Sequence, residues 1–306
     1  MPSGLQASIR LFRLAGVDVF LHWSWFLVAV FEIKSGSDRY SSVVWNVFEY
    51  LALFLIVLIH EYGHAMACRK VGGTAKTIVL WPLGGVAYVD PPQRPGATLW
   101  SIAAGPLVNV ALLPVLFLAL MISVTSHWAQ LRPDLYKLVI AVSVIDLGLL
   151  LFNMLPIYPL DGGQILRSIL WYVMGRARSL LVATVIGFLG VAALVIFAIR
   201  SGSAWYFILS IFIVVNCWAG FKHSIFLLRL AKVPRRLGFA CPWCSAGPLL
   251  GAFWVCSQCQ SNFDAFATDG VCPSCTNPDL LALCFDCGRH HKVSDWVPQR
   301  PLAQES

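Results

Sequence analysis

Three ionisable residues interrupt an apolar stretch of the chain near residue 60. His60 and His64 are four positions apart, and Glu61 directly follows the first histidine. Positions i and i+4 of a helix lie on one face, so both imidazoles can point at one site. Two histidines at this spacing bind zinc, and the adjacent glutamate can act as a base toward a water that zinc activates. The HExxH pattern therefore predicts a zinc-dependent hydrolytic site.

The apolar surroundings of these residues argue against a chance occurrence of HExxH, although chance matches are common in soluble proteins. An ionisable residue in a membrane helix costs roughly 2.5–3.5 kcal/mol on insertion scales and usually serves a function. Here three stand together, and residues 43–66 contain no Lys or Arg that could pair with them. A functional role is thus favoured over a structural one.

A second polar interruption offers a further metal ligand. Residues 151–167 read LFNMLPIYPLDGGQILR, in which Pro156 and Pro159 precede Asp161 and two glycines. Proline removes a backbone donor and opens a helix, and glycine allows close backbone approach. Alone, Asp161 could simply cap a helix end. Beside HExxH in the same bundle, it predicts a carboxylate ligand on a broken helix.

The elements that must position these residues are membrane helices. Of the 306 residues, 58% are hydrophobic and 12% charged, whereas soluble domains carry about 25% charged residues. Several apolar runs reach the roughly 20 residues that cross a bilayer. We predict spans at residues 17–34, 43–66, 98–125, 137–158, 179–199 and 203–222. The first is retained as a span because it carries Asp18 and His22 and lacks the small-residue cleavage site of a signal peptide.

Basic residues set the expected orientation. With the N-terminus inside, fourteen Lys and Arg residues flank the inner ends of the spans and five flank the outer ends. Because positive charge is retained on the cytoplasmic side, we expect a multi-pass protein of the cell membrane with both termini in the cytoplasm. The net charge of +7 then follows from topology and from contact with lipid headgroups.

Residues 70–97 do not read as a span. The short β-prone runs TIVLW and VAYV flank the residues PLGG at 82–85, which predicts a hairpin or re-entrant loop. At membrane depth such backbone must be buried in protein or face a wet cavity. The expected fold class is an all-α polytopic membrane protein with a re-entrant β-type loop and a small Cys-rich domain.

The composition changes after Phe221. We assign residues 1–222 to the membrane domain, 223–238 to a basic, partly helical linker and 239–306 to a small cytoplasmic domain with four CxxC pairs. Eight paired thiols predict two structural Cys₄ zinc sites, a duplicated zinc ribbon. The ligands would be Cys241, Cys244, Cys256, Cys259, Cys272, Cys275, Cys284 and Cys287. We prefer a sequential arrangement, in which the first and second CxxC pairs bind one zinc ion and the third and fourth bind the other. A cross-braced arrangement stays open. Cytoplasmic location disfavours disulfides, and a redox relay is a minor alternative.

The two polar stretches resemble the signature motifs of a known family. HEYGH at 60–64 and NMLPIYPLDGG at 153–163 are similar to those of the site-2 protease family of intramembrane zinc metalloproteases. The resemblance covers about residues 9–222 and includes WPLGGVA at 81–87 and AAGPLVNV at 103–110. It implies a zinc metalloendopeptidase that cleaves membrane-protein substrates within their transmembrane segments.

The resemblance also implies roles for individual residues. His60, His64 and Asp161 would bind one catalytic zinc, with Glu61 as general base. Asn153 would hold substrate or the developing oxyanion near the metal. The remaining matches would support the site and present an edge strand to an extended substrate: Asn109, Gly84 and Gly85.

Without a PDZ-like insertion, the chain resembles the compact six-span branch of this family, which acts on regulatory or sporulation-type membrane substrates. That branch often ends in nucleotide-sensing modules, whereas this chain ends in cysteines. Asp146, in the fourth span, is either a bundle-facing polar contact or a residue of a wet cavity, and we favour the structural contact.

The Cys-rich domain has few features of a nucleic-acid-binding module. Residues 237–306 hold three basic and six acidic residues, whereas nucleic acid requires a basic face. Its aromatic residues either pack the small core or form a protein-binding surface: Trp243, Phe253, Trp254 and Trp296. We expect a regulatory or substrate-recruiting role through a protein partner.

Two other functions compete with proteolysis. A non-catalytic zinc-binding scaffold or receptor would have no need of the acid at Glu61. A zinc transporter would need acidic or His residues on several helices, and the spans at 179–199 and 203–222 are nearly free of them.

Overall fold

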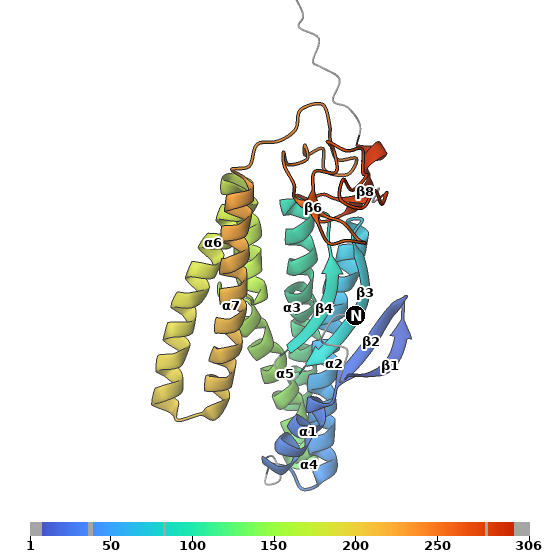
Figure 1. Ribbon diagram of the computed structural model, residues 1–306. Coiled ribbons are helices and arrows are strands. Elements are labelled where there is room, and N and C mark those ends of the chain that lie inside the picture. The colour runs from blue at the N-terminus through green and yellow to red at the C-terminus, as the bar shows by residue number, and fades with distance from the viewer. Residues whose placement is uncertain (1–7, 36–38, 82–83, 279–280, 297–306) are drawn as a thin grey trace, which may run out of the picture. The chain divides into compact units, whose positions relative to one another are not determined.

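Helices long and apolar enough to cross a membrane dominate the fold. The computed structural model describes residues 8–35, 39–81, 84–278 and 281–296. Within these ranges five helices qualify as spans: α2 (Val43–Lys70), α3 (Pro95–Thr125), α5 (Pro133–Asn153), α6 (Asp161–Ser201) and α7 (Ala204–Leu230) (Figure 1). Two shorter helices are α1 (Ser24–Ser35) and α4 (Trp128–Leu131). These spans confirm five of the six expected positions.

The expected first span, residues 17–34, is not one helix, and this prediction was wrong. Strand β2 (Val17–His22) takes up its first part and α1 its second. Val17 and Val19 are fully buried while Asp18 and Phe20 are partly exposed, which is the period-two alternation of a strand. Pairing in a sheet satisfies this backbone, so the apolar stretch does not have to be helical.

The N-terminal strands join the predicted hairpin in one four-stranded sheet. Its strands are β1 (Ser8–Leu14), β2, β3 (Thr74–Trp81) and β4 (Gly84–Asp90), in that spatial order. β2 and β3 are parallel, and the other two pairs are antiparallel. The β3–β4 pairing confirms the re-entrant β-type loop, in which Gly84 and Gly85 begin β4; Pro82 and Leu83 lie outside the described residues. β4 is an edge strand.

The sheet and α3 both pack against α2. Buried apolar side chains of β2, β3 and α2 form one cluster, to which Val19, Ile78 and Cys68 belong. Gly63 of α2 lies against α3, because a Cβ atom there would come within 2.7 Å of the Ala104 carbonyl oxygen. Small residues at a helix crossing allow this close approach.

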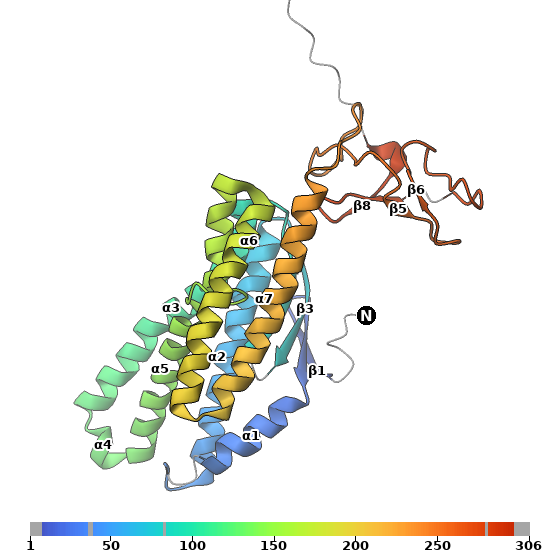
Figure 2. The ribbon, with the colours of Figure 1, turned by 60° about the vertical axis from the view of Figure 1, so that its left-hand side comes forward.

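α6 is two helical stretches in sequence, separated at Gly175, whose φ of 79° and ψ of 170° are not helical. Its first turn lies against the irregular segment 154–160, because Cβ atoms at Gly162 and Gly163 would collide with the main chain of that segment. The two glycines thus allow the turn that places Asp161 at the start of α6. The second stretch of α6 lies beside α7 (Figure 2), where Val191 shares a buried apolar cluster with α7 side chains.

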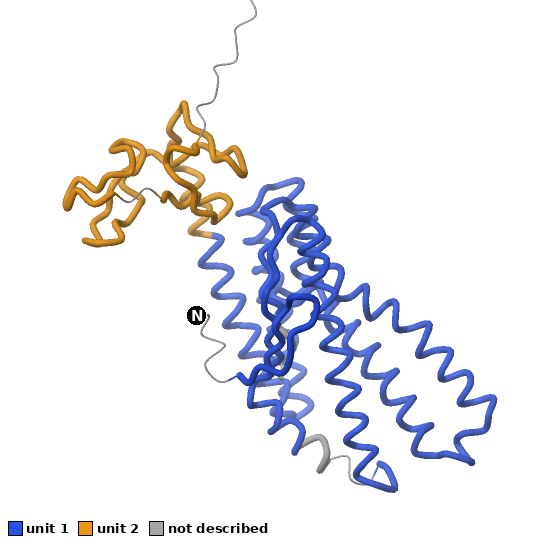
Figure 3. The backbone as a smooth tube through the Cα atoms, turned by 90° about the vertical axis from the view of Figure 1, so that its right-hand side faces the viewer, with its two compact units in different colours: residues 1–224 blue, residues 225–306 orange. Residues whose placement is uncertain are grey.

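The chain divides into two compact units, residues 1–224 and 225–306 (Figure 3). The second unit has two small hairpins, β5 (Trp254–Val255) with β6 (Asn262–Phe263) and β7 (Leu281–Leu283) with β8 (His290–Lys292), followed by a 3₁₀ turn at Val293–Asp295. Of its aromatic residues, Trp254 and Trp296 are buried in the core, whereas Trp243 and Phe253 are exposed. The set therefore splits between core and surface.

Candidate metal centre and active site

Donor atoms of His60, His64 and Asp161 converge between two membrane helices. His60 and His64 lie one turn apart on α2, and Asp161 is the first residue of α6. The two Nε2 atoms are 3.1 Å apart, and Asp161 Oδ2 lies 3.0 Å from that of His60 and 3.4 Å from that of His64. The structure therefore brings together residues that are about 100 positions apart in the sequence.

The spacing of these atoms suits a zinc ion. Zinc binds nitrogen and carboxylate oxygen at about 2.0–2.1 Å in a tetrahedron, which puts neighbouring donors about 3.3 Å apart. The three separations fall around this value. Three protein donors leave a fourth position open, as in catalytic rather than structural zinc sites.

Both imidazoles are held so that Nε2 is available to a metal. His60 Nδ1 lies 2.6 Å from Asn109 Oδ1, and His64 Nδ1 lies 2.9 Å from the Ser101 carbonyl oxygen. Each of these oxygens accepts a hydrogen bond, so each Nδ1 carries the proton and each Nε2 has a free lone pair. Ser101 was not singled out from the sequence, because a main-chain acceptor leaves no residue-type signal.

Glu61 lies beside the candidate metal-binding atoms, and its carboxylate is hydrogen-bonded to strand β4. Its Oε2 accepts a hydrogen bond from the Ala87 main-chain N–H of β4 at 2.9 Å. Oε1 makes no hydrogen bond with the described residues. Glu61, His60 and His64 are all buried, and their ligand atoms lie within 4.8 Å of one another. The edge strand β4 therefore adjoins the proposed base.

Asn109 connects the site to a carboxylate that sequence reasoning assigned to structure. Its Nδ2 donates to Asp146 Oδ1 at 2.7 Å, so the hydrogen-bonded chain runs from α2 through α3 to α5. Asn153, at the end of α5, is half-buried and makes no side-chain hydrogen bond with any described residue. Its role stays a prediction.

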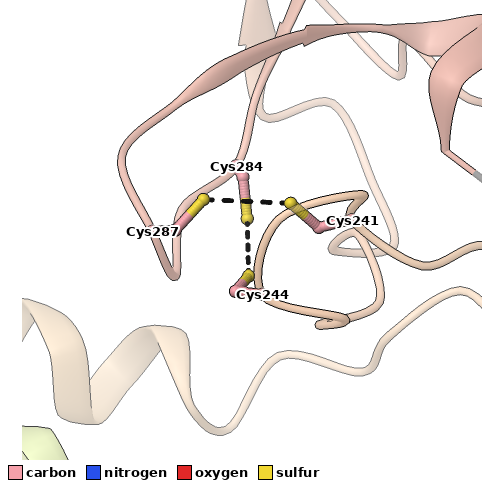
Figure 4. Close-up of side chains that lie close together, drawn as sticks. All are labelled: Cys241, Cys244, Cys284 and Cys287. Carbon is pink, nitrogen blue, oxygen red and sulfur yellow. Dashed lines mark hydrogen bonds between the residues drawn. The ribbon is translucent and has the colours of Figure 1, made fainter. Parts of the chain in front are cut away.

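In the second unit, the eight paired cysteines form two groups of four. Cys241 Sγ lies 3.8 Å from Cys287 Sγ, and Cys244 Sγ lies 3.6 Å from Cys284 Sγ (Figure 4). The other group joins Cys256 to Cys275 and Cys259 to Cys272, each at 3.6 Å. Tetrahedral zinc with bonds of about 2.3 Å puts sulfur atoms about 3.8 Å apart, so both groups suit zinc.

The observed grouping is nested: the first CxxC pair joins the fourth, and the second joins the third. The preferred sequential pairing was therefore wrong, and the arrangement is not cross-braced either. Arg235, which precedes the first pair, donates to both carboxylate oxygens of Asp286, which lies within the fourth pair, at 2.6 and 3.0 Å. This ion pair joins the first and last parts of the unit. The two hairpins are joined separately, because Trp254 Nε1 donates to the Leu283 carbonyl oxygen at 3.2 Å.

The fold and the site define a polytopic membrane protein with a buried HExxH group that could hold a metal ion. Peptidase family M50 matches the chain at residues 48–131 and 121–197. The chain resembles the solved site-2 protease from Methanocaldococcus jannaschii, with a TM-score of 0.51 and 30% identity, covering 70% of this chain and 95% of that one. The chain belongs to peptidase family M50, the site-2 protease family of zinc metalloproteases.

Curated relatives match part of the chain. Zinc metalloprotease MJ0392 of M. jannaschii is 32% identical over 209 residues, which is 68% of this chain and 59% of that protein. Stage IV sporulation protein FB of Bacillus subtilis is 37% identical over 118 residues, 38% of each chain. The chain thus matches little more than half, or less, of these relatives' length.

Proposed function

We propose that this chain is an intramembrane metalloendopeptidase that hydrolyses peptide bonds within the transmembrane segments of membrane-protein substrates. The supporting observation is the convergence of His60, His64 and Asp161 at tetrahedral spacing, with the carboxylate of Glu61 beside them. Family membership supports the reaction class. The proposed protein binds three zinc ions, one at this centre and one in each Cys₄ group.

The residues divide the chemistry between them. A zinc ion held by His60, His64 and Asp161 would supply Lewis-acid activation of water and of the scissile carbonyl. Glu61 accepts the proton of the attacking water at its Oε1 and returns it to the leaving amine, a contribution of roughly 10²–10⁴ in rate. The Ala87 N–H fixes Oε2 and thereby orients Oε1.

The edge of β4 suits an extended substrate. A transmembrane helix satisfies its own backbone groups, so it must unwind before a peptide bond can reach the metal. Strand addition to an exposed sheet edge holds a peptide extended through main-chain hydrogen bonds. Ala87 pairs with Ile78 of β3 while its N–H points away from β3 toward Glu61. A substrate strand beside β4 would therefore lie next to the base, with Asn153 as a contact to substrate.

The location and the second unit complete the proposal. The distribution of basic residues supports cytoplasmic termini and an active site open to the cytoplasm. The Cys-rich unit would recruit or gate substrate by binding a protein, because it is acidic and exposes Trp243 and Phe253. The membrane domain would be residues 1–222, with a basic linker to 238.

Metal counting tests the proposed function. The purified full chain is expected to hold three zinc ions, and His60→Ala, His64→Ala and Asp161→Ala are each expected to hold two and to lose cleavage. Elemental analysis after removal of loosely bound metal gives the count. A full chain that holds only two zinc ions when fully reconstituted would remove the basis of the catalytic proposal.

Gly105 offers an independent test, because a Cβ atom at this α3 position would meet both imidazole rings. We expect Gly105→Ala to push His60 and His64 apart and to weaken the third zinc at least about tenfold, a loss typical of a disturbed ligand shell. Chelator competition measures this. Gly148→Ala on α5 is the matched control, since a Cβ atom there meets nothing within 4 Å. Equal zinc affinity in both variants would contradict the site geometry.

A further inference from the structure

Asp146 is an acidic residue within α5 whose side chain makes a single hydrogen bond with the described residues. The residue is fully buried, and its Oδ1 accepts the hydrogen bond from Asn109 Nδ2. Its Oδ2 is buried and has no hydrogen-bond partner among the described residues. No Lys or Arg among those residues forms an ion pair with Asp146 either. A carboxylate within a membrane segment is expensive and usually functional, so a purely structural contact does not account for it.

The chemistry of a carboxylate fixes the orientation of Asn109. In the structure the amino group of Asn109 faces Asp146 Oδ1 and its carbonyl oxygen faces His60 Nδ1, which is the orientation that a carboxylate accepting a hydrogen bond from the amide requires. His60 Nδ1, 2.6 Å from that oxygen, must then carry the proton. The imidazole is thereby held in the tautomer whose Nε2 is free, and that atom faces Asp161. A flipped Asn109 would favour the opposite tautomer, with Nε2 protonated and unable to bind a metal.

We propose that Asp146 is a positioning residue for the metal centre: acting through Asn109, it selects the metal-binding tautomer of His60 and places a negative charge behind that ligand. This inference rests on the zinc site of the proposed function. Partners of this kind hold metal-binding histidines in orientation, and their loss typically costs 10–100-fold in affinity or activity.

The second histidine has no such requirement. His64 donates to the main-chain carbonyl of Ser101, which accepts only and cannot flip. The asymmetry explains why one ligand needs a side-chain relay and the other does not. It also predicts that variants of the relay weaken the metal centre without removing it.

Zinc affinity of the full chain, measured by chelator competition for the most weakly held of its three zinc ions, tests the proposal. Asp146→Val is expected to weaken that zinc by about 10–100-fold while cleavage returns to near the wild-type rate at saturating zinc. Asp146→Asn keeps the shape but loses the charge and the obligate acceptor, and an intermediate weakening is expected. Asp134→Asn on the same helix is the control; it lies about 18 Å along the axis and binds Ser41.

A double-mutant cycle separates action through Asn109 from an independent effect. Asn109→Leu and the double variant Asn109→Leu with Asp146→Val should bind zinc equally weakly, because the relay is already broken in the first. If the double variant instead bound zinc more weakly than Asn109→Leu, by the factor that Asp146→Val alone causes, Asp146 would not act through Asn109. Wild-type zinc affinity in Asp146→Asn would also overturn the proposal. If the wild-type chain held no third zinc, the proposed function itself would fail, which is a distinct result.

Discussion

Glu61→Gln is expected to reduce cleavage by at least about 10²-fold, the usual contribution of a general base, while the third zinc stays bound. Glutamine cannot accept the proton of the attacking water. It is nearly isosteric with glutamate, however, and its side-chain oxygen can still accept from the Ala87 N–H. Single-turnover cleavage of a transmembrane substrate in vesicles measures the rate, and elemental analysis measures the zinc.

Glu49→Gln is the matched control for this substitution. Glu49 is on the same helix, about 18 Å from Glu61 along the axis, and pairs with Arg39 and Tyr40. Its variant should cleave at the wild-type rate. If Glu61→Gln cleaved nearly as fast as this control, another residue would have to supply the base, and the proposed division of roles would be wrong.

Removing the first and last CxxC pairs together is expected to release one zinc ion from the Cys-rich unit, not two. The nested groups place Cys241, Cys244, Cys284 and Cys287 around one site, so changing all four to Ser leaves the inner site whole. In a sequential arrangement the same variant would damage both sites. The fourfold variant of the full chain should therefore retain two of three zinc ions by elemental analysis.

The same variant separates recruitment from hydrolysis. Structural zinc contributes about 10–16 kcal/mol to the folding of small zinc-bound units, so the outer part of the unit should unfold. Cleavage of a short model transmembrane peptide is expected to stay near the wild-type rate, whereas cleavage of a natural substrate should change several-fold. Loss of peptide cleavage with the membrane zinc still bound would make this unit part of the catalytic machinery.

The metal donors were predictable because their signals are local or chemically unusual. His60 and His64 share a helix face by spacing alone, and Asp161 stands out as a carboxylate between prolines and glycines. Their convergence at 3.0–3.4 Å agrees with this prediction. Their assignment as zinc ligands remains a proposal.

Other features were not predictable because two signals competed or none existed. In residues 17–22 a strand alternation lies within an apolar run of bilayer length, and the length suggested a helix. The nested grouping of the cysteines depends on contacts between residues far apart in the sequence, such as Arg235 with Asp286. The gaps between successive pairs are too similar to predict it. The role proposed for Asp146 could not be predicted from its neighbours in the sequence, because its partner Asn109 is 37 positions away on another helix.

The two histidines also differ in whether a substitution can remove the hydrogen-bond acceptor of their Nδ1 atom. The acceptor for His64 is a main-chain carbonyl, which remains under almost any substitution at Ser101, whereas the acceptor for His60 is a side chain that one substitution can delete. Of the two histidines proposed as metal ligands, His64 would therefore keep its acceptor under most substitutions, whereas His60 would lose its acceptor by a single substitution at Asn109. Under the proposed roles, selection for weaker or stronger zinc retention could act on Asn109 and Asp146 while the three ligands stay unchanged.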